Sequence, residues 1–469
     1  MYGRRICFDG FNRLKIAALL PFTAPRRGTK IPAMDRIKIY NIKPRKENFK
    51  MSREENHSVS NKGAGQINRR GFLAGAGAAA LSFAVINPKL VRGTEANAKI
   101  NIGLIGCGGR GTWIADLFMR HGGYNFIAAA DYFDDRVSVF GDKFKIPALR
   151  RYTGLSCYKR MLDDRVDAIV IESPPYFHPE QAAAGVDAGV HVFLAKPIAV
   201  DVVGCNTIAE SGRKATAGKR CFLVDFQTRA NDLFCEAVNR VHNGAIGKFA
   251  FGEATYHADN PWKGMIDALA KDPANPVNRL RAWGLDKILS GDIITEQNIH
   301  TLDVMSWIMN DAPLRAFGRG GRTVRTDAGD IWDHFVAVFE YPDNVAFSFS
   351  SRQFNGHGTS PEGIRNRIFG SKGVLETEYG GAVLIRGENF YRGGNTPDIY
   401  EQGAVGNIRT FYKNITTGDF TNSTVESSVR SNLVTILGRT AAYEGRIVAW
   451  DEIVKSNQKL QANLKGLKD

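Results

Sequence analysis

The stretch that most constrains the fold is residues 99–111, KINIGLIGCGGRG. Its first half is a short apolar run, typical of a buried parallel strand, and its second half places Gly106, Gly108 and Gly111 in the pattern GxGxxG. A helix-forming segment, residues 112–120, follows directly. In such a unit the glycines permit a tight turn, a close approach of the backbone to a pyrophosphate, and close packing of helix on strand. The pattern therefore predicts that a dinucleotide binds where the helix begins, because unpaired N–H groups and the helix dipole attract phosphate there.

The next predicted strand, residues 126–130, ends in a carboxylate, Asp131, at about the usual ~20 residues beyond the glycines. A carboxylate at this position accepts hydrogen bonds from the ribose hydroxyls of NAD and repels the 2′-phosphate of NADP. Tyr132 and Phe133 add no cation that would reverse this preference. Because Arg136 is the one cation nearby, the sequence predicts NAD and leaves NADP as the less favoured alternative.

Further apolar strands are predicted at residues 167–171, 191–194 and 221–224, with helical segments between them. This alternation predicts a doubly wound parallel α/β domain, a Rossmann fold, over residues 99–224. Ligands of such sheets bind beyond the carboxyl ends of the strands, so residues that follow the strands join the glycine turn as candidates. The predicted cofactor-binding residues are Gly106, Gly108, Gly109, Arg110, Gly111, Asp131, Ser173, Pro174, His178, Lys196 and Gln227.

The second half of the chain has a different pattern. Strand-like stretches, alternating or rich in aromatic residues, occur at residues 248–256, 335–354, 373–378 and 382–385. Short turns such as Pro342-Asp343-Asn344 separate neighbouring strands, which favours an antiparallel sheet. A long helix is predicted at residues 425–444, with apolar residues at helical spacing that pack on the sheet. We therefore expect an α+β domain with a largely antiparallel open sheet over residues 225–469.

The net charge of +14 lies almost wholly in a leader, residues 1–98. The leader has 19 Lys and Arg against 6 Asp and Glu, a net charge of +13, whereas residues 99–469 have 43 against 42. A nearly neutral body argues against nucleic acid as a partner, because such binding needs a basic surface on the folded domain.

The leader resembles a twin-arginine (Tat) export signal at about residues 61–98. Asn68-Arg69-Arg70-Gly71-Phe72-Leu73 precedes a short, weakly apolar run, and Ala96-Asn97-Ala98 offers small residues for cleavage. The precursor is therefore expected to use the Tat machinery, and the mature protein to be periplasmic or otherwise extracytoplasmic, with an uncleaved signal anchor as the alternative. Residues 1–50 show no such pattern, so we expect translation to begin near Met51 and the first 50 residues to be a mis-assigned start.

Five cysteines remain after the leader, an odd number without the spacing of a metal site: Cys107, Cys157, Cys205, Cys221 and Cys235. They are predicted to be buried free thiols. A chain that folds in the reducing cytoplasm and is exported folded needs no disulfide framework.

Three further motifs follow the glycine turn in order: Lys196-Pro197 after a strand, Phe226-Gln227-x-Arg229 after the next strand, and His300 followed by Asp303 on a helix. With the glycine turn, they resemble the Gfo/Idh/MocA family over about residues 99–455. The resemblance implies an NAD(P)-dependent oxidoreductase of sugars, inositols or related polyols, with its active site between the two domains.

The resemblance implies that Lys196 and His300 are catalytic residues and that His300 acts as the acid/base. The family has an aspartate four residues before this histidine, where the chain has Glu296. Residues at i and i+4 share one helix face, so Glu296 is expected to orient or charge-couple to His300. The family also has a glutamate before the catalytic lysine, where this chain has Ala195, so Lys196 is expected to lack its neighbouring carboxylate.

These residue types suit alcohol oxidation by hydride transfer, which needs a proton acceptor at the hydroxyl and a cation for the developing alkoxide. No metal is expected, because Glu296 and His300 make half a metal site at most and no third ligand has recognisable spacing. Residues that could line a sugar pocket are His178, Tyr256, His257, Asp259, Trp262 and Lys263.

The sequence therefore predicts an oxidoreductase that transfers hydride between a nicotinamide cofactor and a secondary alcohol of a sugar, inositol or polyol. Because little free NAD is present outside the cytoplasm, the cofactor is expected to be tightly bound. Two alternatives stay open: a glycoside-cleaving enzyme that uses NAD for transient oxidation and elimination, and a cofactor-bound sugar-binding protein without turnover. The resemblance also implies a homo-oligomer formed through the outer face of the antiparallel sheet.

Overall fold

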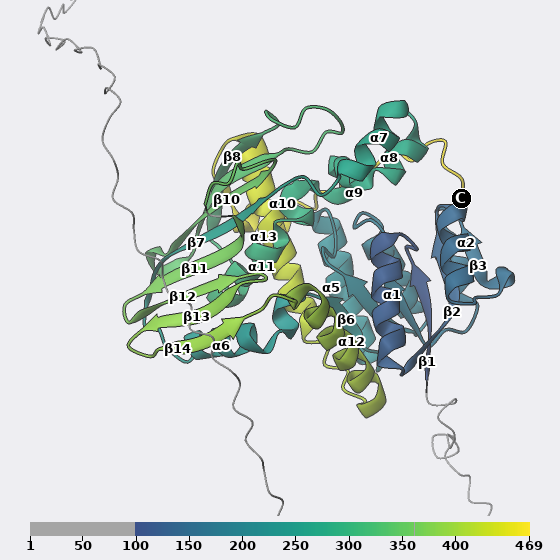
Figure 1. The fold of residues 1–469 in the computed structure, drawn as a ribbon, viewed down its shortest axis with the longest axis horizontal. Coiled ribbons are helices and arrows are strands. Elements are labelled where there is room, and N and C mark those ends of the chain that lie inside the picture. Colours follow the sequence, from purple (N-terminus) through teal and green to yellow (C-terminus); the bar gives the residue numbers. More distant parts are fainter. Residues whose placement is uncertain (1–98, 361) are drawn as a thin grey trace, which may run out of the picture. The chain divides into compact units, whose positions relative to one another are not determined.

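In the computed structural model, which describes residues 99–360 and 362–469, the first predicted strand opens a six-stranded parallel sheet (Figure 1). The strand order is β3-β2-β1-β4-β5-β6. The strands are β1 (Ile100–Ile105), β2 (Tyr124–Asp131), β3 (Arg151–Thr153), β4 (Ala168–Ile171), β5 (His191–Ala195) and β6 (Phe222–Asp225). The chain runs outward in both directions from β1 and β4, so the crevice beyond their carboxyl ends is a ligand site by topology.

Helices cover both faces of this sheet. Ala168 and Val170 of β4 pack in one core, whereas Ile169 and Ile171 pack in another. A strand buried on both faces has the continuous apolar sequence that marks residues 167–171. The helices that follow the strands are α1 (Gly109–His121), α2 (Asp134–Lys143), α3 (Cys157–Leu162), α4 (His178–Asp187) and α5 (Val202–Ala217).

The second half of the chain forms a nine-stranded sheet in the order β14-β13-β12-β11-β7-β10-β9-β8-β15. Its pairings are antiparallel except that the central β7 (Phe249–Ala258) pairs β10 (Ala346–Gln353) in parallel. The two strands can run in parallel because helices and two other strands separate them in the chain. The remaining strands are β8 (Arg315–Gly321), β9 (His334–Glu340), β11 (Gly363–Gly370), β12 (Gly373–Glu378), β13 (Ala382–Gly387), β14 (Tyr391–Asn395) and β15 (Val448–Ala449).

The predicted long helix is α13 (Thr424–Glu444), and it packs on β8 and β9 as well as on α5 and β6 of the parallel sheet. It therefore joins the two halves, and the described residues belong to one compact unit. The other helices are α6 (Asp232–His242), α7 (Lys263–Lys271), α8 (Pro276–Arg281), α9 (Lys287–Ser290), α10 (Asp292–Glu296), α11 (Ile299–Met309), α12 (Ile399–Thr417) and α14 (Trp450–Lys455).

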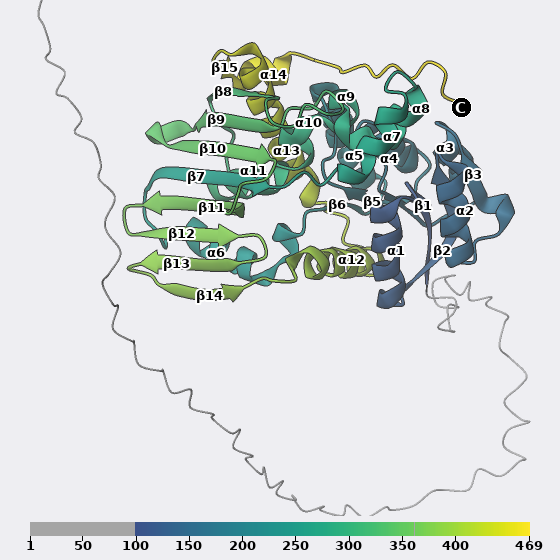
Figure 2. The ribbon, with the colours of Figure 1, turned by 45° about the horizontal axis from the view of Figure 1, so that its top comes forward.

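After α14 the chain returns to the parallel sheet as an extended tail, seen in yellow in Figures 1 and 2, which we call the C-terminal strap (residues 457–469). The Leu460 N–H donates to Asp201 Oδ2 at 2.7 Å, and the Lys468 N–H donates to the Tyr132 hydroxyl at 3.3 Å. The strap therefore ties the end of the chain to the turn that follows β2.

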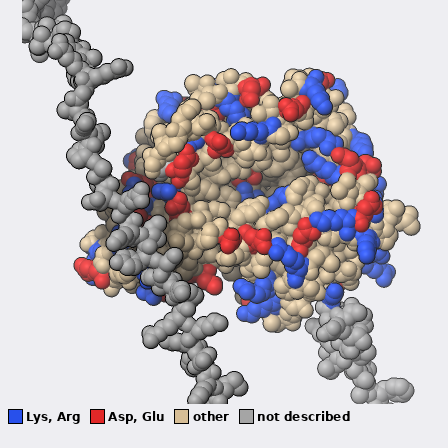
Figure 3. Space-filling model, in the orientation of Figure 1, with Lys and Arg blue, Asp and Glu red and all other residues tan. Residues whose placement is uncertain are grey.

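All five cysteines of the described residues are free thiols, as the sequence predicts. Four of them are buried, whereas Cys235, also expected to be buried, is partly exposed. Blue and red side chains are interspersed on the face seen in Figure 3, as the even balance of charge over residues 99–469 leads one to expect. Within the described part of the chain, no helix is long and apolar enough to cross a membrane. The leader, with its export signal and its start at Met51, lies outside the described residues.

Candidate functional site

The glycine turn between β1 and α1 is shaped by two close approaches of the backbone. Gly106 has a φ of +95°, and a Cβ there would lie 2.6 Å from backbone atoms of Glu172 and Ser173. A Cβ on Gly111 would lie 1.9 Å from the carbonyl oxygen of Gly106. By contrast, no atom lies within 4 Å of the Cβ position of Gly109, so space remains where α1 begins. No side chain caps the N-terminus of this helix, which leaves its N–H groups available for the phosphates of a dinucleotide.

Asp131 accepts hydrogen bonds from the backbone of two turns, the glycine turn and the turn that follows β2. Its Oδ2 accepts from the N–H of Cys107 at 2.7 Å, and its Oδ1 accepts from the N–H of Phe133 at 2.9 Å. Burial raises the pKa of Asp131. A carboxylate oxygen accepts more than one hydrogen bond, so ribose hydroxyls can still reach Asp131 from the cavity that it lines. The Arg136 guanidinium, over the Phe133 ring at 4.7 Å, lines the same cavity.

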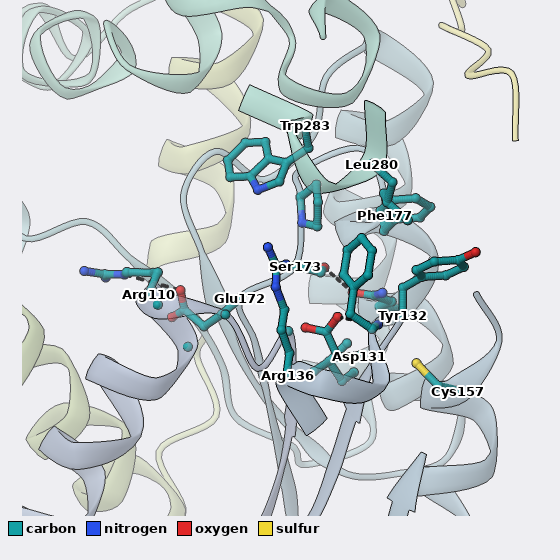
Figure 4. Close-up of a pocket in the computed structure, with 18 of the residues that line it drawn as sticks. Arg110, Asp131, Tyr132, Arg136, Cys157, Glu172, Ser173, Phe177, Leu280 and Trp283 are labelled. Atoms are coloured by element: carbon teal, nitrogen blue, oxygen red, sulfur yellow. Dashed lines mark hydrogen bonds and ion pairs between the residues drawn. The ribbon is translucent and has the colours of Figure 1, made fainter. Parts of the chain in front are cut away.

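That cavity, of about 310 Å³, extends from the glycine turn to Trp283, which lies across it from Asp131 (Figure 4). We call it the glycine-turn cavity. Its lining includes these predicted cofactor-binding residues: Gly106, Gly108, Gly109, Arg110, Gly111, Asp131, Ser173 and Pro174. A cleft lined by a glycine turn, the carboxylate at the end of β2 and apolar walls fits a nicotinamide dinucleotide.

A second cavity, of about 350 Å³, holds the predicted catalytic residues Lys196, Glu296 and His300, and we call it the histidine cavity. The other predicted cofactor-binding residues, His178 and Gln227, line it too. It shares part of its wall with the glycine-turn cavity, so that the two meet; the shared residues are Arg110, Glu172, Ser173, Trp262 and Trp283. The face seen in Figure 3 is hollowed near its centre.

The expected pairing of Glu296 with His300 on one helix face is wrong. Helix α10 ends at Glu296 and α11 begins at Ile299, because the Asn298 N–H bonds back to the carbonyl of Ile293 and closes the first helix. With the chain turned between them, the two side chains make no hydrogen bond to each other.

Glu296 instead pairs with Lys196. The Lys196 Nζ donates to the Glu296 carbonyl oxygen at 2.7 Å and lies 3.3 Å from Oε1. Glu296 Oε2 also accepts from the side-chain amide of Gln297 at 2.6 Å. This geometry corrects the expectation that Ala195 leaves the lysine without a carboxylate neighbour. Glu296 supplies one from the other half of the molecule.

His300 is buried, and its Nδ1 has no hydrogen-bond partner among the described residues. Its ring lies 5.4 Å from the ring of Tyr379. Burial, with the nearby cations Lys196 and Arg110, holds the pKa of His300 well below its usual range. The imidazole is therefore neutral at pH 7 and has a nitrogen free to take a proton.

His178 joins the ends of two strands. Its Nδ1 lies 2.8 Å from the carbonyl oxygen of Pro197, and its Nε2 lies 2.7 Å from that of Ser173. Burial lowers its pKa to about 4. The ring nitrogens are thus engaged by the backbone, and His178 positions the turns after β4 and β5.

Sequence reasoning missed the charged cluster where the two cavities meet. Arg110 Nη2 lies 2.7 Å from Asp225 Oδ2, and Arg110 Nε lies 3.3 Å from Glu172 Oε2. Despite the guanidinium, burial raises the pKa of Glu172 to about 7. The sequence carried one indication of this cluster, which is that both acids stand at the carboxyl ends of apolar strands.

The residues named as a sugar pocket divide between two places. His178, Tyr256 and Trp262 line the histidine cavity, together with Tyr379 and Tyr400, which the sequence did not indicate. The other residues lie elsewhere: His257 contacts Ser350 at 3.0 Å, and a third cavity is lined by Asp259 and Lys263. Over residues 99–360 and 362–469, no group of three His, Cys, Asp or Glu side chains could hold a metal ion.

Two family models match the chain. The model of an oxidoreductase family with an NAD-binding Rossmann fold, GFO_IDH_MocA, matches residues 100–223. The model of the GFO/IDH/MocA C-terminal domain matches residues 234–376. Together they cover more than half of the chain, including most of the parallel sheet and strands β7 to β11 of the second sheet.

Individual relatives are distant. The chain is 24% identical to the myo-inositol 2-dehydrogenase of Thermotoga maritima over 371 residues, which are 76% of this chain and all of that protein. It is 26% identical to the alpha-N-acetylgalactosaminidase of Shewanella oneidensis over 220 residues, 42% of this chain and 47% of that enzyme. The crystal structure of the myo-inositol 2-dehydrogenase of Lactobacillus plantarum has the same fold, with a TM-score of 0.59 at 21% identity over 75% of this chain and 99% of that one.

Proposed function

The chain belongs to the Gfo/Idh/MocA family of oxidoreductases, and from this premise we propose that it transfers hydride between NAD and a secondary alcohol of a sugar, inositol or other polyol. The observation that carries the proposal is the meeting of two cavities. One is lined by the glycine turn and Asp131, and the other by Lys196 and His300. An alcohol in the histidine cavity lies beside both catalytic groups and next to the cofactor.

Each catalytic side chain has the charge that its task requires. Neutral His300 takes the hydroxyl proton, because burial favours the uncharged ring, whose unprotonated nitrogen is an acceptor. Lys196 stabilises the negative charge that develops on the alcohol oxygen, and Glu296 holds the ammonium in place. When bound, a nicotinamide would supply the hydride acceptor.

The proposed cofactor is NAD rather than NADP. Asp131 presents a carboxylate to the cavity where the ribose hydroxyls bind, and a 2′-phosphate there would meet a like charge. Arg136, on the same wall, attracts a 2′-phosphate and so weakens the preference for NAD over NADP.

We infer that the cofactor is loaded in the cytoplasm, carried through the Tat machinery and retained. The leader supports export, and the C-terminal strap supports retention. Leu467 of the strap packs in one apolar cluster with Phe133 and Leu280, two residues that line the glycine-turn cavity. The strap thus supports that wall, and we expect its contacts to slow the release of the cofactor.

A glycoside-cleaving enzyme that uses NAD for transient oxidation and elimination is the second candidate. The match to the Shewanella oneidensis alpha-N-acetylgalactosaminidase favours it, although that match spans less than half of either protein. Release of the leaving group from a synthetic glycoside without net NADH separates the two reactions. Binding of sugars without any turnover would point instead to a non-catalytic protein.

A homo-oligomer is proposed through the outer face of the nine-stranded sheet. That face carries large apolar side chains that are well exposed, including Phe251, Phe317, Val336 and Val338. Phe317 and Val338 lie directly opposite each other on β8 and β9, and clustered exposed apolar side chains of this kind mark interaction sites. Light scattering of the native protein and of Val336→Lys tests the proposal.

The first experiment is to purify the mature protein without added nucleotide, denature it and identify the released nucleotide by mass spectrometry. Near-stoichiometric NAD(H) is expected. NADP in its place would contradict the role given to Asp131, and an empty protein would contradict retention. Assays with sugar and polyol panels then test the reaction itself.

A further inference from the structure

The connection between β5 and α5 begins at Lys196 and passes at once into the protein core. Ile198, Ala199 and Val200 are at most 3% exposed. A buried segment outside helices and strands needs partners for its backbone N–H and C=O groups, because unpaired groups cost free energy. The partners of this connection therefore decide where it lies, and with it where the side chain of Lys196 begins.

Two side chains of α13 bind this connection. Asn432 Oδ1 accepts from the Ile198 N–H at 3.2 Å, and Asn432 Nδ2 donates to the Ala199 carbonyl at 3.1 Å. Arg439 Nη2 donates to the Val200 carbonyl at 2.8 Å. Asn432 is fully buried and Arg439 is 6% exposed, so little water competes for these hydrogen bonds. Three successive residues of the connection are thus held by one helix.

The same helix also holds α10, which ends at Glu296. Arg439 Nη1 donates to the carbonyl of Gly291, the residue before α10, at 2.8 Å. The hydroxyls of Thr435 and Thr295 lie 3.1 Å apart, and both threonines are fully buried. Thr295 directly precedes Glu296 in the chain. Both ends of α10 are therefore attached to α13.

Asn432, Thr435 and Arg439 lie on one side of α13, because residues three and four apart are neighbours on a helix surface. We call these three residues the polar face of α13. The helix is a rigid support, since it packs on β8 and β9 as well as on α5 and β6. One support thus holds the segment of Lys196 and the segment of Glu296, whose Nζ and Oε1 atoms lie 3.3 Å apart.

We propose that the polar face of α13 positions the Lys196–Glu296 pair for catalysis. None of its three residues is among the described residues that line the glycine-turn cavity or the histidine cavity, so they act through the segments that they hold. An ammonium stabilises a developing alkoxide only at close range, and a misplacement of about 1 Å can lower a rate about a hundredfold. This inference rests on the proposed function, in which Lys196 is the cation at the alcohol oxygen.

Arg439→Met removes the guanidinium that joins the two segments. With myo-inositol and D-glucose as probe alcohols, we expect kcat per NAD-loaded active site to fall about 10- to 100-fold. KM and the amount of bound NAD should stay within about twofold, because a neutral alcohol gains its interaction with Lys196 chiefly in the transition state. In crystal structures, the distance from Lys196 Nζ to Glu296 Oε1 should exceed about 4 Å, the limit of an ion pair.

Thr435→Val is the second variant, and it decides the question if Arg439→Met does not fold. Valine keeps the shape of threonine and removes only the hydroxyl that faces Thr295. We expect kcat to fall about fivefold with KM unchanged, the equivalent of one hydrogen bond. Thr435→Ser keeps the hydroxyl and should restore the native kcat.

Arg430→Met is the matched control, because Arg430 is an arginine of the same helix that contacts the far end of α11 instead. Its Nε lies 3.2 Å from Ser306 Oγ, and its Nη2 lies 3.3 Å from Asn310 Oδ1. Its loss should lower the unfolding temperature and leave kcat per NAD-loaded site within about twofold of the native value.

A purely structural role of the polar face would lower the folded fraction and the unfolding temperature, while turnover per NAD-loaded site stayed native. That result, or an equal loss of kcat in Arg430→Met, would overturn the inference. If the native protein oxidises neither probe, the result counts against the proposed function alone. The Nζ to Oε1 distance in crystal structures of the variants then decides, since an increase supports positioning and an unchanged distance contradicts it.

Discussion

The glycine-turn cavity and the histidine cavity share a wall but are built in opposite ways. The first depends on backbone shape within one short motif, where Gly106 and Gly111 leave no room for a Cβ. The second depends on side chains that come from distant parts of the chain, such as Lys196 and Glu296, which are 100 residues apart. Local backbone geometry therefore decides cofactor binding, whereas tertiary packing decides the chemistry. Substitutions in the glycine-turn cavity should therefore impair cofactor binding, and substitutions in the histidine cavity should impair turnover.

The largest effect is expected from the histidine cavity. Lys196→Met and His300→Asn should each lower kcat/KM by about 10² to 10⁴, because one removes the cation at the alcohol oxygen and the other removes the base. The NAD content of both variants should stay near that of the native protein, as neither residue lines the glycine-turn cavity. Turnover that survives both changes within a few-fold would contradict the mechanism.

The pH dependence of the reaction follows from the same histidine. Burial and nearby cations lower the pKa of His300, so the ring stays neutral, and kcat/KM stays level, as the pH falls from 8 to about 6.5, the ordinary pKa of histidine. A decline is expected only at lower pH, where the ring takes up a proton. A rate that already falls between pH 8 and pH 7 would show that another group is the base.

Gly111→Ala should instead disrupt the shape of the glycine-turn cavity. The new methyl group would meet the carbonyl oxygen of Gly106, so α1 must move away from the turn. We expect the loss of bound nucleotide and a decrease of about 1–3 kcal/mol in the free energy of unfolding. Mass spectrometry of released nucleotide and thermal denaturation measure the two effects. Gly109→Ala, where no atom lies within 4 Å, is the matched control and should change stability little.

A smaller effect is expected from the C-terminal strap. Truncation after Ser456 removes the hydrogen bonds of Leu460 and Lys468 and the packing of Leu467. Because these contacts support the wall of the cofactor cavity, nucleotide dissociation should accelerate about tenfold, the equivalent of 1.4 kcal/mol. Dissociation is followed by exchange into isotopically labelled NAD. The exposed Lys465→Ala keeps the strap and should exchange at the native rate.

The last effect is on stability alone and concerns Glu172, on the shared wall. Burial raises its pKa from 4.5 to about 7, so the folded protein binds the proton more tightly than the unfolded chain does. The free energy of unfolding should therefore fall as the pH rises from about 4.5 to about 7, by about 3 kcal/mol from this group. Glu172→Gln should flatten that part of the stability profile, measured by urea denaturation at several pH values. An unchanged slope would show that Arg110 keeps Glu172 ionised.

Much of the fold was predictable because its signals are local. Apolar runs between helical segments marked every strand of the parallel sheet except the three-residue β3, which is too short to show a period. In the second sheet, β9 and β10 were visible from alternation, whereas β8, β11, β14 and β15 were missed. Glycines interrupt β8 and β14, and β15 has only two residues. The parallel pairing of β7 with β10 could not be predicted, since nothing local specifies which distant strand lies beside another.

The residues of the candidate site also divide into those that local sequence indicated and those that only the fold brought together. The sequence by itself indicated the glycine turn and Asp131, because a fixed spacing within one motif carries them, and the resemblance to the family pointed to Lys196 and His300. Only the tertiary structure decided that Glu296 pairs with Lys196 and that Arg110 joins Glu172 to Asp225. The physical reason is that these arrangements join strand ends and turns far apart in the chain, and side-chain hydrogen bonds depend on distances that only packing sets.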